Sequence, residues 1–186
     1  NYLGQSYWSL SKVQDTLVNC AKSIEYFNEI LKTISIETHP VEYAKIKNWI
    51  GNSYTAFAEV ESREENCLIA INAYNEALKV FNKRAYPLEY ARAHNNLGGA
   101  YLILAEVKDK TANYKKAISS FEEALRVEIN KESPKLYALT KNNIANTYAR
   151  LSDIEDAESN LKRSIEAYND VLALQSKEKA PLQYGL

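Results

Sequence analysis

Hydrophobic residues recur along the chain at the spacing of an amphipathic α-helix, in stretches that come in pairs. The first stretch of one pair places its apolar and small residues on a single helical face: Tyr90, Leu97, Gly98, Tyr101, Leu104 and Ala105. The second stretch does the same: Ala117, Ile118, Phe121, Ala124 and Leu125. The pattern predicts first helices over 41–60, 88–107 and 135–152, and second helices over 64–82, 111–129 and 155–176.

The paired stretches belong to an internal repeat with a period of 47 residues. The four prolines define it: Pro40, Pro87, Pro134 and Pro181. A tyrosine keeps the same register: Tyr7, Tyr54, Tyr101 and Tyr148. Because repeats of paired helices bury their apolar faces by stacking, we predict an all-α fold, an α-solenoid of antiparallel helical hairpins forming one domain over 1–186. Its units are 1–39 (truncated), 40–86, 87–133 and 134–180, and 181–186 begin a further unit.

Local signals support the first helix of each unit. Each proline fits the first helical position, where no amide donor is needed. Glu42 and Glu89 place negative charge in the first turn, and Ser133 is a suitable N-cap. Gly98 lies inside a helix, where it predicts close approach of a second helix. Ala145 fills the same position in the next unit, which argues against a need for positive φ.

The phrase Leu97-Gly98-x2-Tyr101, followed by Ala117-x3-Phe121-x2-Ala124 and Pro134, resembles the tetratricopeptide repeat signature. The usual unit has about 34 residues, and the longer unit with its Asn-Asn-Leu-Gly phrase looks most like repeats of the kinesin light chain type. The resemblance implies a right-handed superhelix in which the first helices line a concave groove. Such grooves bind peptides or partner domains.

Composition and charge narrow the possible partners. The formal net charge is −1, without the basic excess of a typical nucleic-acid binder. The longest apolar runs are too short to cross a bilayer, and no basic-then-apolar leader is visible. We therefore expect a cytoplasmic (intracellular) protein that binds neither nucleic acid nor membrane. Because the sequence contains no methionine, we expect it to be a piece of a larger protein.

No residue pattern indicates chemistry. Cys20 and Cys67 share a position that Tyr114 and Leu161 fill in later units, so we predict reduced cysteines that are at least partly buried. His39 and His94 lack a second ligand at a meaningful spacing, and His94 is predicted on a helix surface. We therefore predict no catalytic residues, metal site or cofactor, and the chain is not expected to be an enzyme.

Two asparagine ladders follow the repeat. One is predicted to satisfy backbone groups where each second helix begins: Asn19, Asn66, Asn113 and Asn160. The other lies inside the first helices, opposite the apolar face: Asn1, Asn48, Asn95 and Asn142. Its amides either bind a peptide in the groove or form a hydrogen-bond ladder between helices. The candidate groove residues are Lys45, Asn48, Asn52, Arg92, Asn95, Leu102, Asn142 and Asn146.

The favoured function is a protein-interaction scaffold that binds a protein or peptide ligand in this groove. The alternative is a structural or self-assembling spacer or sensor arm of a larger multidomain protein. RNA binding and enzymatic activity remain weaker alternatives. We also expect exposed apolar surface at both ends of the solenoid, and hence end-to-end self-association.

Overall fold

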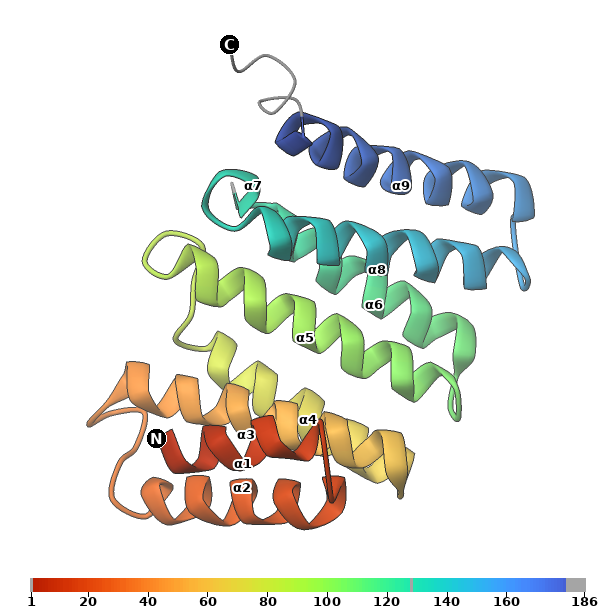
Figure 1. Cartoon of the computed structure of the whole chain (residues 1–186). Helices are drawn as coiled ribbons and strands as arrows, with labels where there is room; N and C mark the ends of the chain where they lie inside the picture. Colours follow the sequence, from red (N-terminus) through yellow and green to blue (C-terminus); the bar gives the residue numbers. More distant parts are fainter. Residues whose placement is uncertain (1, 128, 180–186) are drawn as a thin grey trace.

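The computed structural model describes residues 2–127 and 129–179, which fold into helices joined by short connections (Figure 1). Four hairpins pair α1 (Tyr2–Ser11) with α2 (Thr16–Leu31), α3 (Pro40–Val60) with α4 (Arg63–Leu78), α5 (Pro87–Ala105) with α6 (Lys110–Leu125), and α8 (Pro134–Ser152) with α9 (Ala157–Lys179). A single helical turn, α7 (Ile129–Glu132), precedes the last hairpin. The described residues contain no β-strand, which confirms the all-α prediction. The predicted further unit, 181–186, lies outside the described residues.

Helix starts recur with the predicted period. The first helices α3, α5 and α8 begin at residues 40, 87 and 134, and the second helices begin at residues 16, 63, 110 and 157. Proline occupies the start of α3, α5 and α8, as predicted. Ser133 occupies the N-cap position of α8, as predicted, but its side chain makes no capping hydrogen bond. Its backbone closes the turn instead, since the amide of Tyr137 donates to the Ser133 carbonyl (3.1 Å).

The turn within each hairpin has one geometry in all four units. The residue before each second helix has positive φ: Asp15, Ser62, Asp109 and Asp156. Four residues later comes the first asparagine ladder. Each side-chain amide donates to the carbonyl of the residue five positions earlier: Asn19 to Gln14, Asn66 to Glu61, Asn113 to Lys108 and Asn160 to Glu155. The ladder therefore fastens the second helix to the loop before it, which confirms its structural role.

The second helices of the middle units end earlier than predicted, at Leu78 and Leu125 rather than at residues 82 and 129. After each helix ends, the chain buries an apolar side chain against neighbouring first helices. Phe81 is 2% exposed and packs with Ala44 and Ala93, while Ile129 is 1% exposed and packs with Ala91. The unforeseen turn α7 begins at Ile129.

The hairpins stack one on the next from α1 and α2 at one end to α9 at the other (Figure 1). Each second helix packs against the first helix of its own unit, and α2, α4 and α6 also pack against the first helix of the following unit. The first helices α1, α3, α5 and α8 also contact their neighbours in series. No comparable contacts join successive second helices within the described part of the chain. Successive first helices therefore lie closer together than successive second helices. The stack curves toward the more closely spaced layer, so the first helices line the concave side.

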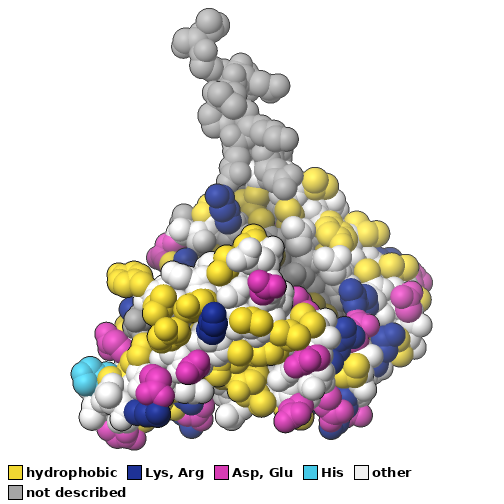
Figure 2. Space-filling view, turned by 60° about the horizontal axis from the view of Figure 1, so that its bottom comes forward, with side chains coloured by type: hydrophobic (Ala, Val, Ile, Leu, Met, Phe, Trp, Pro, Cys, Tyr) yellow, Lys and Arg dark blue, Asp and Glu magenta, His cyan; other side chains and the backbone are white. Residues whose placement is uncertain are grey.

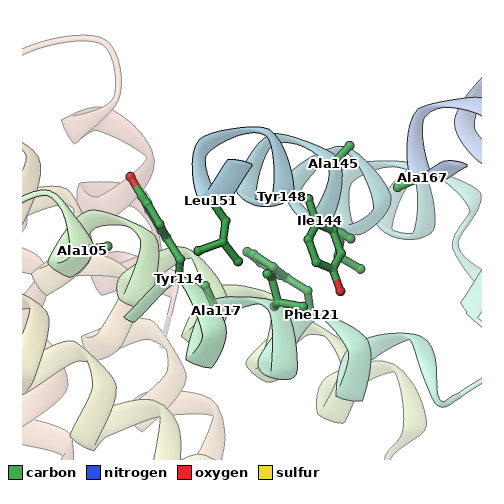
Figure 3. Close-up of a cluster of buried hydrophobic side chains, with 10 residues drawn as sticks. Ala105, Tyr114, Ala117, Phe121, Ile144, Ala145, Tyr148, Leu151 and Ala167 are labelled. Atoms are coloured by element: carbon green, nitrogen blue, oxygen red, sulfur yellow. The ribbon is translucent and has the colours of Figure 1, made fainter. Parts of the chain in front are cut away.

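The junction between hairpins is filled by large side chains packed against small ones. In the cluster of Figure 3, Phe121 and Tyr114 of α6 pack with Ile144, Tyr148 and Leu151 of α8. Within the same hairpin, a Cβ atom built on Gly98 would lie 2.5 Å from Cε1 of Phe121. Gly98 therefore permits the close approach that the sequence predicted.

The two cysteines are buried and free, as predicted. Cys67 lies in the cluster that joins α4 to α5, packed with Ile71, Tyr74 and Leu97. Burial raises the pKa of the Cys67 thiol to about 11, so the group remains an uncharged packing residue near neutral pH.

Candidate functional site

The concave side of the first helices carries two adjoining cavities. The larger, of about 500 Å³, lies against α1, α3 and α5 and is lined in part by Trp8, Thr55, Asn95 and Gly99. The smaller, of about 290 Å³, lies between α3 and α5 and is lined in part by Lys45, Asn48, Trp49 and Arg92. Asn52 and Asn96 line both cavities, so we treat the two as one surface and call it the groove.

The structure brings five of the eight predicted groove residues to this surface: Lys45, Asn48, Asn52, Arg92 and Asn95. The other three, Leu102, Asn142 and Asn146, line neither cavity. Leu102 packs partly buried against the cluster of α6 and α8. Asn146 is exposed, and its Oδ1 accepts a hydrogen bond from the hydroxyl of Tyr168 (2.6 Å).

Asn95 is a structural residue at the floor of the groove. It is 6% exposed, and its Oδ1 accepts hydrogen bonds from Oγ1 of Thr140 (3.1 Å) and Nδ2 of Asn143 (3.3 Å) on α8. An asparagine that served a ligand would face solvent and make few bonds to other helices. At this position the alternative of a hydrogen-bond ladder between helices is therefore correct.

Asn48 occupies the equivalent position one unit earlier, yet its amide is not satisfied. Its Oδ1 is buried and has no hydrogen-bond partner among the described residues. The donor that serves Asn95 is missing because Ala93 replaces Thr140. The second donor is diverted, since Asn96, the counterpart of Asn143, donates to Oδ1 of Asn52 (3.0 Å). A buried acceptor without a donor is costly, so an N–H group that reached Asn48 would stabilise the groove.

The side chain of Asn52 is hydrogen-bonded to α4. The Tyr74 hydroxyl donates to Oδ1 of Asn52 (2.9 Å) and shares a hydrogen bond with Oγ1 of Thr55 (3.0 Å). Burial raises the pKa of Tyr74 well above its ordinary value, so the hydroxyl keeps the proton that it donates. In the third unit Phe121 replaces Tyr74 and Gly99 replaces Asn52. That unit therefore lacks both the side-chain amide and the hydroxyl that would hold it.

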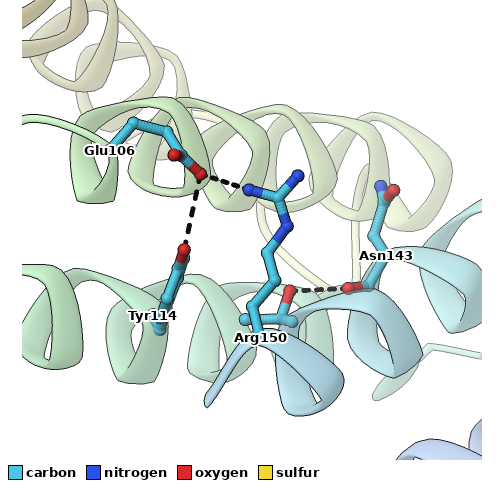
Figure 4. Close-up of polar contacts among 5 residues, drawn as sticks. Glu106, Tyr114, Asn143 and Arg150 are labelled. Atoms are coloured by element: carbon cyan, nitrogen blue, oxygen red, sulfur yellow. Dashed lines mark hydrogen bonds and ion pairs between the residues drawn. The ribbon is translucent and has the colours of Figure 1, made fainter. Parts of the chain in front are cut away.

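The groove has one positively charged edge. Lys45 and Arg92 are exposed and form no ion pair within the described residues, and Glu89 also lines the smaller cavity. Two acidic side chains lie nearby. Glu59 lines the larger cavity, whereas Glu106 is bound to Arg150 and accepts a hydrogen bond from the Tyr114 hydroxyl (3.4 Å; Figure 4).

Sequence reasoning missed the aromatic side chains of the groove. The rings of Trp8 and Trp49 meet edge to face, with centroids 4.8 Å apart, and the ammonium group of Lys12 lies 3.8 Å from the ring centroid of Trp8. These tryptophans are 41 positions apart and do not share a repeat position, so the repeat gave no signal for their contact. Asn96, which lines both cavities, was not among the predicted groove residues.

His94 was predicted on a helix surface, but it is half-buried beside Tyr90, with ring centroids 4.4 Å apart. Its Nδ1 is buried and has no hydrogen-bond partner within the described part of the chain. Burial lowers the pKa of His94 to about 4, so the ring is neutral near pH 7.

Within residues 2–127 and 129–179, no three His, Cys, Asp or Glu side chains are grouped so that they could hold a metal ion. None of the described helices combines the length and the apolar character needed to cross a membrane.

Comparison with known proteins agrees with the repeat. A family model described as a tetratricopeptide repeat matches residues 100–170, which include parts of α5 and α9 and all of α6 and α8. The match supports a repeat of the tetratricopeptide type, a class whose members generally serve as protein-interaction scaffolds. No curated protein matches the chain.

Proposed function

We propose that this chain is a protein-interaction scaffold whose groove binds an extended peptide segment of a partner protein. The observation that carries the proposal is the unsatisfied Oδ1 of Asn48 on a surface that also presents Asn52 and Asn96. An extended peptide offers an N–H and a C=O group at every residue, and side-chain amides can pair with both. The resemblance to repeats of the kinesin light chain type implies that the first helices line a groove for a peptide or a partner domain, which supports a ligand on this side.

Charge adds a preference to this proposal. Lys45 and Arg92 stand at one edge of the smaller cavity without ion-pair partners in the described part of the chain. We expect the bound segment to place an acidic side chain at that edge, because a carboxylate there gains charge-assisted hydrogen bonds. Trp49 lines the same cavity and offers an apolar contact to the remainder of the segment.

A displayed library of random linear peptides tests the proposal. Peptides selected on the wild-type chain should bind the Asn48→Ala and Arg92→Glu variants at least about tenfold more weakly, since each loses about 1.4 kcal/mol or more of polar contact. The matched control is Lys116→Glu, which reverses an exposed charge on α6 outside the groove. Control binding should equal that of the wild type.

Two results would contradict the groove assignment. One is a failure to select any peptide that binds the folded chain reproducibly. The other is a set of selected peptides whose affinity falls with Lys116→Glu but not with Arg92→Glu, because such peptides would be bound on the outer helices.

A further inference from the structure

A further cavity, which we call the outer cavity, lies between the second helices α2 and α4 and the end of α3. It has a volume of about 490 Å³ and shares no lining residue with the groove. Its apolar lining includes Ile24, Tyr54, Phe57 and Ile69. The hairpins that follow α4 leave it open, and a cavity at the equivalent position between α6 and α9 is open although α5 and α6 form a full hairpin before it. The opening therefore belongs to this position of the repeat.

The tyrosine of the outer cavity lacks a cation that its counterparts have. In the other three units a basic group of the second helix lies over the ring of the equivalent tyrosine, at 5.2, 5.6 and 5.4 Å from its centroid: Lys22 over Tyr7, Lys116 over Tyr101 and Arg163 over Tyr148. In the second unit Ile69 takes the place of the basic residue. Within the described part of the chain, no Lys or Arg lies over the ring of Tyr54.

The carboxylates of the outer cavity lack their cation as well. In the equivalent cavity, Glu155 forms an ion pair with Lys115 (2.7 Å). Glu61 keeps the position of this glutamate, but Ala21 replaces the lysine. Figure 2, which looks toward the end of the stack that holds α1 and α2, shows hydrophobic side chains gathered between charged ones. The outer cavity thus presents three exposed carboxylates that form no ion pair within residues 2–127 and 129–179: Glu25, Glu61 and Glu65.

We propose that the outer cavity docks a basic segment of a partner protein, which places a Lys or Arg side chain over the ring of Tyr54. The other three units show this arrangement with cations of their own. A cation between an aromatic ring and carboxylates is attracted by both. Because the aliphatic stem of Lys or Arg covers apolar surface, Phe57 and Ile69 favour such a side chain over a small inorganic cation.

The test uses the whole chain and a displayed library of linear peptides in which two positions are fixed as arginine. Peptides selected on the wild type should bind Ile69→Lys at least about tenfold more weakly, because the new lysine occupies the cavity and repels the arginine. This variant should fold, since Lys22 and Lys116 hold the equivalent position, and circular dichroism checks it. The matched control is Ile165→Lys, the same change at a position on α9 that is 58% exposed and lines neither the groove nor the outer cavity. Its affinity should equal that of the wild type.

A second variant removes charge from the outer cavity without adding bulk. Glu61→Gln should weaken binding of the selected peptides at least about threefold, since a charge-assisted hydrogen bond becomes a neutral one. Added salt should weaken binding to the wild type, because it screens exposed charges.

The outcomes separate this proposal from peptide binding in the groove, on which it does not depend. Asn48→Ala tests the groove and should leave the affinity of the arginine peptides unchanged. Three results would overturn docking at the outer cavity. They are a library that yields no peptide binding the folded chain, selected peptides that bind Ile69→Lys as tightly as the wild type, and an equal loss of affinity in Ile165→Lys, which would reveal a general effect of charge.

Discussion

Replacing Gly98 with alanine should destabilise the solenoid, whereas the same change at its neighbour Gly99 should stabilise it. A Cβ atom at Gly98 would lie 2.5, 2.6 and 2.8 Å from three atoms of the Phe121 ring. That ring is 0% exposed and is packed with Ile144 and Tyr148, so it cannot move aside without disturbing the next hairpin. A Cβ atom at Gly99 would meet nothing within 4 Å.

The magnitudes follow from two opposing effects. Alanine favours the helix over glycine by about 1 kcal/mol at either position. Overpacking a well-filled core costs about 1–3 kcal/mol, and three contacts shorter than 3.0 Å against an immobile ring place Gly98 near the upper end. The expected net effects are a loss of about 1–2 kcal/mol for Gly98→Ala and a gain of up to about 1 kcal/mol for Gly99→Ala.

Thermal unfolding followed by far-ultraviolet circular dichroism measures both variants against the wild type. Each kcal/mol shifts the midpoint by roughly 2–4 °C in a chain of this size, so a gap of about 1–3 kcal/mol should separate the midpoints of the two variants by about 2–12 °C. A Gly98→Ala variant at least as stable as the wild type would refute the close-approach argument. Ala145 occupies the equivalent position, and there the counterpart of Phe121 is Tyr168, which is 38% exposed rather than enclosed by a following hairpin, so an alanine Cβ atom meets a less confined ring.

Three other changes test separate parts of the structure. Asn95→Ala should lower the free energy of unfolding by about 1–3 kcal/mol because donors on α8 lose their acceptor. Asn142→Ala should change the free energy of unfolding by less than about 0.7 kcal/mol. Chemical denaturation of the two variants compares these effects. Asn113→Ala should cost about 1 kcal/mol by releasing the turn before α6, and amide hydrogen exchange should be faster in that turn; unchanged exchange would contradict the role given to the ladder. His94 has a pKa of about 4 when folded and an ordinary value of 6.5. The unfolded chain therefore binds its proton first, and the free energy of unfolding should fall by up to about 2 kcal/mol as the pH drops from 6.5 to 4. His94→Gln should remove this component and His39→Gln should not.

The sequence by itself determined the helices and their order. Proline at the first helical position, the apolar spacing and the strict 47-residue period are local signals, and each unit meets the same neighbours when it stacks. Helix starts were therefore predictable to within two residues. The ends of α4 and α6 were not, because burial of Phe81 and Ile129 under the next hairpin outweighs the tendency of the chain to continue as helix.

The tertiary structure alone decided what each groove asparagine does. Asn48 and Asn95 occupy the same repeat position and are indistinguishable by pattern. Asn95 is satisfied by α8, because Gly99 offers no competing acceptor and Asn143 is free to donate to Asn95. Asn48 is left without a donor, because the side-chain amide of Asn96 donates its hydrogen bond to Oδ1 of Asn52 instead. A hydrogen bond depends on which partners lie within about 3 Å, and those partners come from units 44 to 48 residues away, beyond the reach of any local pattern.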